Sequence, residues 1–224
     1  MFLLLPGTIS AQETSKEKDL FERAVKYFYE KKFEMAELLL QESLKQNPEN
    51  RLAYSYLGDI FLKKKRYDGA LQLYRKAIDI NPDGANYFRI GQVYYYKKMG
   101  DIAIENFKKS VALNPKLKFA YYHIGLTYLM LLRKKEQTIS YWEKYLGIAP
   151  EDPQYEKIRR AIELLKDPNF IIPPIGSDIP IEEALHLGGA ILKDSKHSAE
   201  GKKAGHEQKK TKDKIEDIYR DDDL

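Results

Sequence analysis

Hydrophobic residues recur at helical spacing through most of this chain, and prolines interrupt them at nearly constant intervals. The spacings between these prolines are 34, 33 and 35 residues, and three of the four follow an asparagine: Pro48, Pro82, Pro115 and Pro150. Proline disfavours helical geometry in the residue before it and cannot continue a helix. Each proline therefore predicts the end of one helix and the start of another shortly after it.

The same residue types return at the same positions in each interval. The shared positions are Tyr54, Leu57, Gly58, Phe61, Ala70 and Tyr74 in the second interval; Tyr87, Ile90, Gly91, Tyr94, Ala103 and Phe107 in the third; and Tyr121, Ile124, Gly125, Tyr128, Thr138 and Trp142 in the fourth. The first interval is a degraded copy with Leu20, Ala24, Tyr27, Ala36 and Leu40. Glycine inside a helix costs about 1 kcal/mol relative to alanine, so we expect the glycines to permit close helix packing against Ala70 and Ala103. The fourth copy departs at Thr138 and carries one extra residue near Lys134.

These copies resemble the tetratricopeptide repeat, a helix–turn–helix unit of about 34 residues with the pattern W-x2-L-G-x2-Y…A-x3-F…P. The resemblance covers about residues 16 to 150 and implies an all-α, right-handed superhelical solenoid of four repeats. The implied repeats span about residues 17–50, 51–83, 84–117 and 118–151.

Elements that close the array are predicted at both ends of a repeat domain over residues 13–166. Residues 152–166 are amphipathic and predict a single capping helix, since the last repeat would otherwise leave one face uncovered. At the other end, Thr14 and Glu17 have the spacing of a capping box and predict the start of the first helix.

The first twelve residues are largely apolar and carry no charge. They are too short to span a bilayer but are similar to the apolar core and small-residue end of a secretory signal. We therefore expect residues 1–12 to be a signal-peptide remnant and the protein to be exported to a bacterial periplasm. A cytoplasmic protein with an apolar N-terminus is the alternative.

The chain changes character after residue 166. Residues 167–192 are rich in proline, which predicts an extended segment with a short helix over residues 180–187. The apolar run over residues 170–175 is expected to lie along the repeats. Residues 193–224 are charged and of low complexity, which predicts a disordered tail.

Composition and motifs argue against catalysis. The chain has no cysteine, which excludes disulfides, cysteine-ligated zinc and a thiol nucleophile. It contains no metalloprotease, serine-hydrolase or phosphate-binding-loop motif, and its four histidines are scattered. We predict no enzyme activity, no cofactor, no metal site and no small-molecule substrate.

The surface chemistry instead favours a module that binds a protein or a peptide, as an adaptor or assembly factor. The chain has seventeen tyrosines, residues that pack an apolar ring, keep a hydroxyl for a partner and are enriched at interfaces. The net charge of +4 indicates no obligatory nucleic-acid partner. The identity of the partner and the oligomeric state are not encoded in any motif found here.

The family resemblance implies that the first helix of each repeat lines a concave, ligand-binding face. The residues that it places there are Tyr56, Asp59, Phe88, Arg89, Gln92, Tyr95, Phe119, Tyr122 and His123. The alternative is that several of them turn inward to the core. Repeats that grip acidic C-termini use Lys, Asn and Arg at fixed places, where this chain has Phe21, Val25, Tyr56 and Ala85, and only Arg89 fits. A peptide with apolar anchors suits this face better than a carboxylate does.

A second candidate surface is a basic ridge at the turns between paired helices. It comprises eleven residues: Lys31, Lys32, Lys63, Lys64, Lys65, Arg66, Lys97, Lys98, Arg133, Lys134 and Lys135. Stacked repeats would align these turns along one edge. The alternative is that cations simply suit exposed turns and helix C-termini. The ridge supports a second functional hypothesis, a cytoplasmic scaffold associated with nucleic acid or another anionic surface.

Overall fold

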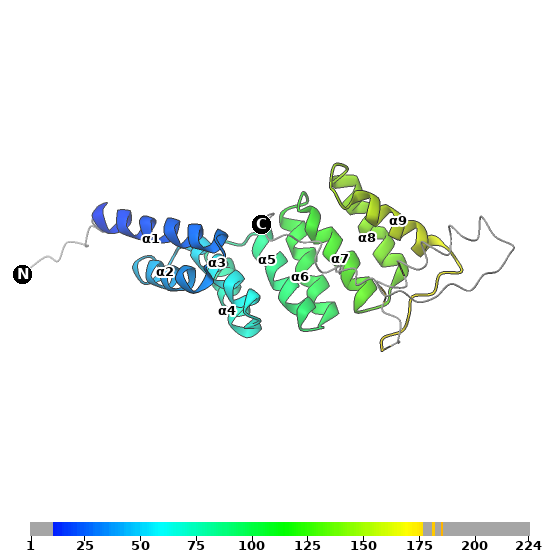
Figure 1. The fold of residues 1–224 in the computed structure, drawn as a ribbon, viewed down its shortest axis with the longest axis horizontal. Coiled ribbons are helices and arrows are strands. Elements are labelled where there is room, and N and C mark those ends of the chain that lie inside the picture. The colour runs from blue at the N-terminus through cyan, green and yellow to red at the C-terminus, as the bar shows by residue number, and fades with distance from the viewer. Residues whose placement is uncertain (1–10, 177–180, 182–184, 186–224) are drawn as a thin grey trace, which may run out of the picture. The chain divides into compact units, whose positions relative to one another are not determined.

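The computed structural model describes residues 11–176 together with residues 181 and 185, and every regular element in residues 11–176 is an α-helix (Figure 1). The elements are α1 (Ala11–Tyr29), α2 (Phe33–Gln46), α3 (Arg51–Lys63), α4 (Tyr67–Ile80), α5 (Gly84–Tyr96), α6 (Gly100–Leu113), α7 (Lys118–Met130), α8 (Lys135–Ile148) and α9 (Tyr155–Lys166). The predicted all-α fold is confirmed. Residues 1–10 of the expected signal segment, most of the expected helix over 180–187 and the charged tail over 193–224 lie outside the described residues.

Proline ends the second helix of each pair, as the sequence pattern predicted. Helices α2, α4, α6 and α8 each stop two residues before one of the four recurring prolines. The intervening residue leaves helical geometry, as Asn81 does with φ −158° and ψ 112°. Side chains then start the next helices: Asn50 Oδ1 accepts a hydrogen bond from Ala53 N at 3.1 Å, and Asp83 Oδ1 accepts one from Asn86 N at 2.8 Å.

The chain divides into two compact units, residues 1–120 and residues 121–224, which are described separately. In the first unit, α1 packs with α2, α3 with α4 and α5 with α6, and the first helices of successive pairs also touch. A buried cluster joins α1, α2 and α3 around Leu40 and Ile60, and a second one joins α4 to α5 around Tyr74 and Val93. Each core therefore forms between neighbouring helix pairs, which is the arrangement expected of a repeat protein.

Aromatic rings, and not alanine methyl groups, lie closest to the glycines of the repeat. A Cβ atom built on Gly58 would lie 2.5 Å from the Tyr74 ring, and one on Gly91 would lie 2.5 Å from the Phe107 ring. Ala70 and Ala103, which we expected to face these glycines, are fully buried, but the rings lie nearer to the glycines. Glycine is needed because each ring occupies the volume that any larger residue would fill.

The second unit repeats this contact with a larger ring. The Trp142 ring lies against Gly125, and its Nε1 donates a hydrogen bond to Tyr122 O at 3.1 Å. Thr138 Oγ1 donates to Lys134 O at 2.9 Å and lies 3.2 Å from Gly125 O, so the hydroxyl that departs from the pattern is satisfied inside the pair. The turn between α7 and α8 has four residues where the other pairs have three, which confirms the extra residue.

The ends of the array differ from the expectations. The proposed capping box lies inside α1, and Glu17 Oε1 instead accepts hydrogen bonds from Ser43 Oγ at 2.8 Å and Asn50 Nδ2 at 2.9 Å. Glu17 thus joins α1 to α2 and to the start of the next pair. Helix α9 begins at Tyr155, three residues later than expected, because Asp152 Oδ1 holds Gln154 N in a turn at 2.9 Å.

Candidate protein-binding surfaces

Most of the predicted concave-face rings belong to the core. Phe88, Tyr95 and Tyr122 are only 1%, 3% and 1% exposed, respectively. The Phe88 ring centroid lies 5.5 Å from that of Phe107, and Tyr122 stacks on Trp142 at 5.9 Å with 12° between the ring planes. The interpretation that these three rings face a ligand is corrected: they gain more by packing between helices than by contact with water.

His123 is also buried and does not form a polar surface. Burial lowers the pKa of its imidazole to about 3, so the side chain is neutral at physiological pH. Within residues 11–176, 181 and 185, no three His, Cys, Asp or Glu side chains gather in a way that could hold a metal ion. The prediction of no enzyme activity and no cofactor stays a prediction.

Asp59 and Arg89, two predicted ligand-binding residues, bind each other. Arg89 Nε donates to Asp59 Oδ1 at 2.7 Å, and the Tyr74 hydroxyl donates to the same oxygen at 2.8 Å. The two charged side chains are 10–12% exposed. Burial lowers the pKa of Arg89, but the neighbouring Asp59 and Tyr74 more than compensate and raise it above its ordinary value. The group therefore bridges α3, α4 and α5 rather than presenting charge to a partner.

An aromatic patch remains accessible on α1 and α3. It consists of Phe21, Tyr29, Leu52 and Tyr56; Tyr29 is 52% exposed and Leu52 46% exposed, while the other two are half-buried. The hydroxyls of Tyr29 and Tyr56 lie 3.3 Å apart, and the Phe21 ring centroid is 6.0 Å from that of Tyr56. Burial, followed by the hydrogen bond with Tyr29, raises the pKa of Tyr56 to about 12. The patch thus combines two mutually bonded hydroxyls with an apolar surface.

Sequence reasoning found Tyr56 but missed Tyr29 and Leu52. Tyr29 is the last residue of α1, as Lys63 is of α3 and Tyr96 is of α5. Aligning the repeats in the sequence could therefore have indicated that Tyr29 and Tyr96 occupy equivalent positions. Gln92 and Phe119, the two other predicted concave-face residues, are half-buried and are not part of this patch.

The basic ridge is partly neutralised by acidic residues of the preceding repeat. Lys64 Nζ lies 2.9 Å from Glu37 Oε2 and 3.2 Å from Glu34 Oε1, and Lys97 Nζ lies 2.6 Å from Asp68 Oδ1. Three further ion pairs and capping contacts involve ridge residues: Lys32 with Glu30 at 2.7 Å, Arg66 with Glu37 at 3.4 Å, and Lys135 Nζ with Asp167 O at 2.9 Å. The ridge is therefore less positive than the count of eleven cations implies.

Three of its lysines occupy an unusual backbone conformation. Lys31, Lys65 and Lys98 have φ values of 59°, 56° and 60° in the turns that follow α1, α3 and α5. Each donates its N–H to the carbonyl three residues earlier, as Lys65 N does to Leu62 O at 2.9 Å, and the next residue closes a wider turn, as Arg66 N does with Phe61 O at 2.8 Å. This helix ending normally uses glycine, because a side chain in the left-handed region costs roughly 1–2 kcal/mol.

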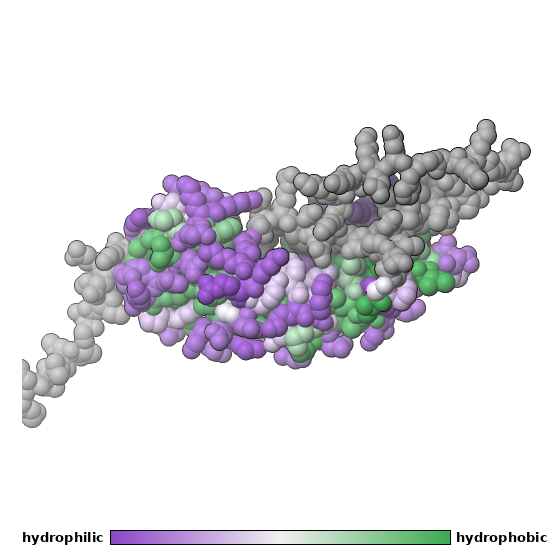
Figure 2. All heavy atoms as spheres, turned by 60° about the horizontal axis from the view of Figure 1, so that its bottom comes forward, coloured by the Kyte–Doolittle hydropathy of each residue, from purple (hydrophilic) through white to green (hydrophobic). Residues whose placement is uncertain are grey.

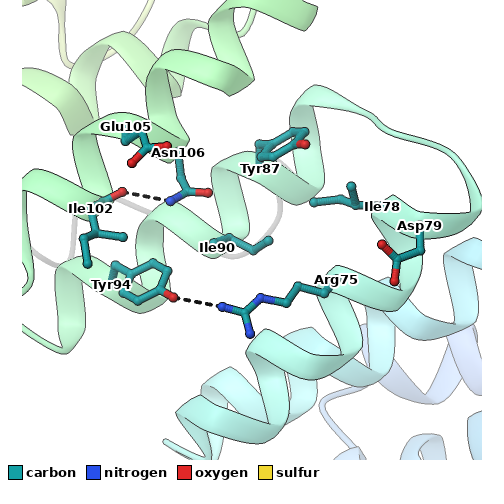
Figure 3. A pocket seen from close by; sticks show the side chains of 9 residues that line it. All are labelled: Arg75, Ile78, Asp79, Tyr87, Ile90, Tyr94, Ile102, Glu105 and Asn106. Carbon is teal, nitrogen blue, oxygen red and sulfur yellow. Dashed lines mark hydrogen bonds between the residues drawn. The ribbon is translucent and has the colours of Figure 1, made fainter.

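A pocket of about 280 Å³ lies between α4, α5 and α6 (Figure 3), and its lining includes no residue of the aromatic patch. Its lining residues are Arg75, Ile78, Asp79, Tyr87, Ile90, Tyr94, Ile102, Glu105 and Asn106. Arg75 Nη2 donates to the Tyr94 hydroxyl at 3.0 Å, and Asn106 Nδ2 donates back to Ile102 O of its own helix at 2.8 Å. One repeat earlier, the position of Asn106 is held by Leu73, which packs on the N-terminal core cluster. At this position the third repeat thus has a shorter, polar side chain, which fills less of the space beside the pocket.

Comparison with family models decides what kind of repeat this is. Two tetratricopeptide-repeat models match residues 21–85 and residues 85–117. The chain contains tetratricopeptide repeats. The resemblance drawn from the sequence is thereby confirmed, and no curated protein sequence matches the chain.

Solved structures that resemble this tetratricopeptide-repeat chain include three with low sequence identity. Residues 41 to the end of MamA from Desulfovibrio magneticus RS-1 match with a TM-score of 0.56 and 20% identity, over 61% of this chain and 77% of that chain. YrrB, described as a tetratricopeptide-repeat protein with an unusual peptide-binding site, matches with a TM-score of 0.56 and 17% identity, over 85% of this chain and 95% of that chain. A chain of the Cut9–Hcn1 hetero-tetramer of the APC/C matches with a TM-score of 0.59 and 19% identity, over 65% of this chain and 29% of that chain. At these identities the likeness shows the fold alone. The chain spans less than a third of the length of the APC/C chain that it matches. None of its described helices is both long and apolar enough to cross a membrane.

Proposed function

We propose that this tetratricopeptide-repeat protein is an interaction module that binds a peptide or protein segment through the aromatic patch. Tetratricopeptide repeats as a class bind peptides and proteins, and YrrB carries that description in its solved structure. The observation that carries the proposal is the pair Tyr29 and Tyr56, whose hydroxyls lie 3.3 Å apart. Tyr29, on α1, is 52% exposed. Tyrosine is one of the residue types that are enriched at binding hot spots.

The chemistry of the patch favours an apolar anchor over an acidic one. The one residue that fits a carboxylate clamp, Arg89, is bonded to Asp59 and nearly buried. The Tyr56 hydroxyl is protonated at neutral pH and can donate a hydrogen bond. A ligand with an aliphatic or aromatic side chain and one backbone hydrogen-bonding group would match the patch, since extended peptides offer both.

The test compares two double variants of the full chain as baits in an extract of the native cell. Tyr29→Ala with Tyr56→Ala removes the patch, and Leu38→Ala with Leu113→Ala removes two side chains of similar exposure, 61% and 52%, from second helices. We expect quantitative mass spectrometry to show one set of proteins lost with the patch variant and kept with the control. Purified partner should then bind the patch variant roughly thirtyfold more weakly, at low and at high salt.

Equal capture by both variants would contradict the proposal. A loss confined to low salt would also contradict it, because contacts of apolar rings are not screened by ions.

Export to a periplasm is a separate proposal, which rests on the uncharged and apolar first twelve residues. Mass spectrometry of the native protein should find a mature N-terminus near residues 11–13. An intact Met1 on a protein recovered from the cytoplasm would overturn it.

A further inference from the structure

The three inter-helix turns of the first unit lie beside one another. Lys64, after α3, pairs with Glu34 at the start of α2, and Lys97, after α5, pairs with Asp68 at the start of α4. Each ion pair ties one turn to the beginning of the second helix in the preceding repeat. The turns therefore form a continuous edge of the first unit, made of residues 29–35, 63–68 and 96–102, which we call the turn edge.

Three exposed cations stand along the turn edge, one in each repeat. Lys31, Lys65 and Lys98 are exposed, and none of them forms an ion pair with another described residue. Their neighbours Lys32, Lys64 and Lys97 are paired with carboxylates. The positive charge that the edge presents to a partner is thus concentrated on the three lysines with left-handed backbone.

The left-handed backbone at these three positions indicates that the lysine side chains have a function of their own. Glycine would fit each of the three positions without conformational strain, yet each carries lysine. A local role at the helix C-terminus does not require them, because a second cation lies next to each one at the same helix end. The left-handed backbone closes the helix ends, and Lys98 Nζ also lies 5.6 Å from the centroid of the Tyr95 ring. Glycine would close the same turns without strain, so the repeated choice of an exposed lysine points to a contact outside the protein.

Exposed apolar side chains accompany the cations. They are Tyr29 (52% exposed), Met35 (46%), Tyr96 (42%), Met99 (39%) and Ile102 (36%), all within the turn edge. Over the N-terminal helices in Figure 2, hydrophobic residues appear as small areas among hydrophilic ones. Tyrosine and other apolar side chains mixed with lysine are typical of surfaces that rest on lipid headgroups. This mixture favours a lipid surface over double-stranded nucleic acid, whose non-specific binding depends on cations alone. Single-stranded nucleic acid, which also stacks on aromatic rings, is an arm of the test below.

We propose that the turn edge docks on an anionic phospholipid bilayer. Lys31, Lys65 and Lys98 contact the lipid phosphates, and the exposed Tyr96 and Met99 side chains enter the headgroup layer beside Lys98. Tyr29 belongs to both surfaces, whereas the other aromatic-patch residues, Phe21, Leu52 and Tyr56, lie outside the turn edge and would bind the partner. The protein would then hold that partner at a membrane surface without a membrane-spanning helix of its own.

The experiment measures binding of the full chain to phosphatidylcholine vesicles with and without about one third phosphatidylglycerol, by co-sedimentation. The triple variant Lys31→Gly, Lys65→Gly and Lys98→Gly removes the charge and suits the backbone, so its melting temperature should equal or exceed that of the unmodified chain. The control triple, Lys45→Gln, Lys76→Gln and Lys108→Gln, makes the same change in net charge at exposed positions on second helices.

We expect the anionic vesicles to bind the unmodified and control chains similarly and the glycine variant roughly a hundredfold more weakly. Met99→Ser should weaken binding further at high salt, where the charges are screened. Equal losses in both triples would overturn the proposal, since net charge would then suffice. Unchanged binding in the glycine variant would assign the membrane contact elsewhere, for example to the lysines of residues 193–224. Binding to single-stranded DNA or an acidic polypeptide without binding to vesicles would likewise overturn it.

Discussion

Arg89 on α5 and Asp59 on α3 form an ion pair with a length of 2.7 Å between Nε and Oδ1, and Tyr74 on α4 bonds the same carboxylate. The three side chains come from two successive repeats. Removing one charge would leave the other buried without its counter-ion, which costs about 3 kcal/mol or more. The pair therefore fixes how the third repeat sits on the second.

The first prediction is that Arg89→Met lowers the free energy of unfolding by about 3 kcal/mol. Adding Asp59→Asn to this variant should recover part of the loss, because the uncompensated buried charge is gone. Lys109→Met, which removes an exposed ion pair with Glu105, serves as the control and should change stability by less than about 1 kcal/mol. Denaturant unfolding measures all three, and equal effects of Arg89→Met and Lys109→Met would contradict the bridging role.

The second prediction concerns two glycines in helices. Gly58→Ala should destabilise the protein by about 1–3 kcal/mol, because the new methyl group would lie 2.5 Å from the Tyr74 ring. Gly147→Ala has nothing within 4 Å of the new atom and should stabilise α8 by up to about 1 kcal/mol. Thermal unfolding of the two single variants gives the comparison, and opposite signs are the expected result.

The third prediction is an acid dependence of stability that originates at His123. Its folded pKa of about 3 lies below the ordinary 6.5, so the unfolded chain binds the proton first as the pH falls. The stability that this group contributes is complete above pH 6.5 and is lost as the pH falls towards 3, at up to about 1.4 kcal/mol per unit. His123→Gln should flatten the slope of unfolding free energy against pH in that window. An unchanged slope would show that carboxylates alone account for it.

The fourth prediction uses the pocket between α4, α5 and α6. Asn106→Leu should fill it and raise stability by about 1 kcal/mol, since the side chain lost is bonded only to its own helix among described residues. The reverse change one repeat earlier, Leu73→Asn, should cost about 2 kcal/mol because Leu73 packs on the core cluster. If Asn106→Leu also destabilises the protein, the pocket is not simply missing volume.

The fold was predictable because its determinants are local and repeated. Each of the four recurring prolines ends a helix wherever it stands, and residues such as Leu57 and Phe61 mark one face by helical spacing alone. The boundary errors, at α1 and α9, occurred where a side chain such as Glu17 or Asp152 bonds a residue outside its own predicted element. Such bonds do not follow from a pattern along the chain.

The candidate site was predictable only in part, because the first helices carry aromatic residues on more than one face. In α5, Phe88 and Tyr95 are buried while the adjacent Tyr96 is 42% exposed, although all three are aromatic. Helical periodicity cannot tell a ring that faces the next helix from one that faces water when rings occupy both sides. The residues that a ligand can reach were therefore decided by which helix packs on which.

The sequence by itself determined that this protein is an array of helix pairs, that the pairs repeat about every 34 residues, and that cations occupy each inter-helix turn. The tertiary structure decided which tyrosines remain accessible and which lysines keep an unpaired charge. Lys64 and Lys97 pair with carboxylates 27 and 29 residues earlier in the chain, while Lys31, Lys65 and Lys98 are exposed and form no ion pair with another described residue. A charge is neutralised or a ring is covered by a neighbour in space, and only packing of one repeat on the next supplies that neighbour.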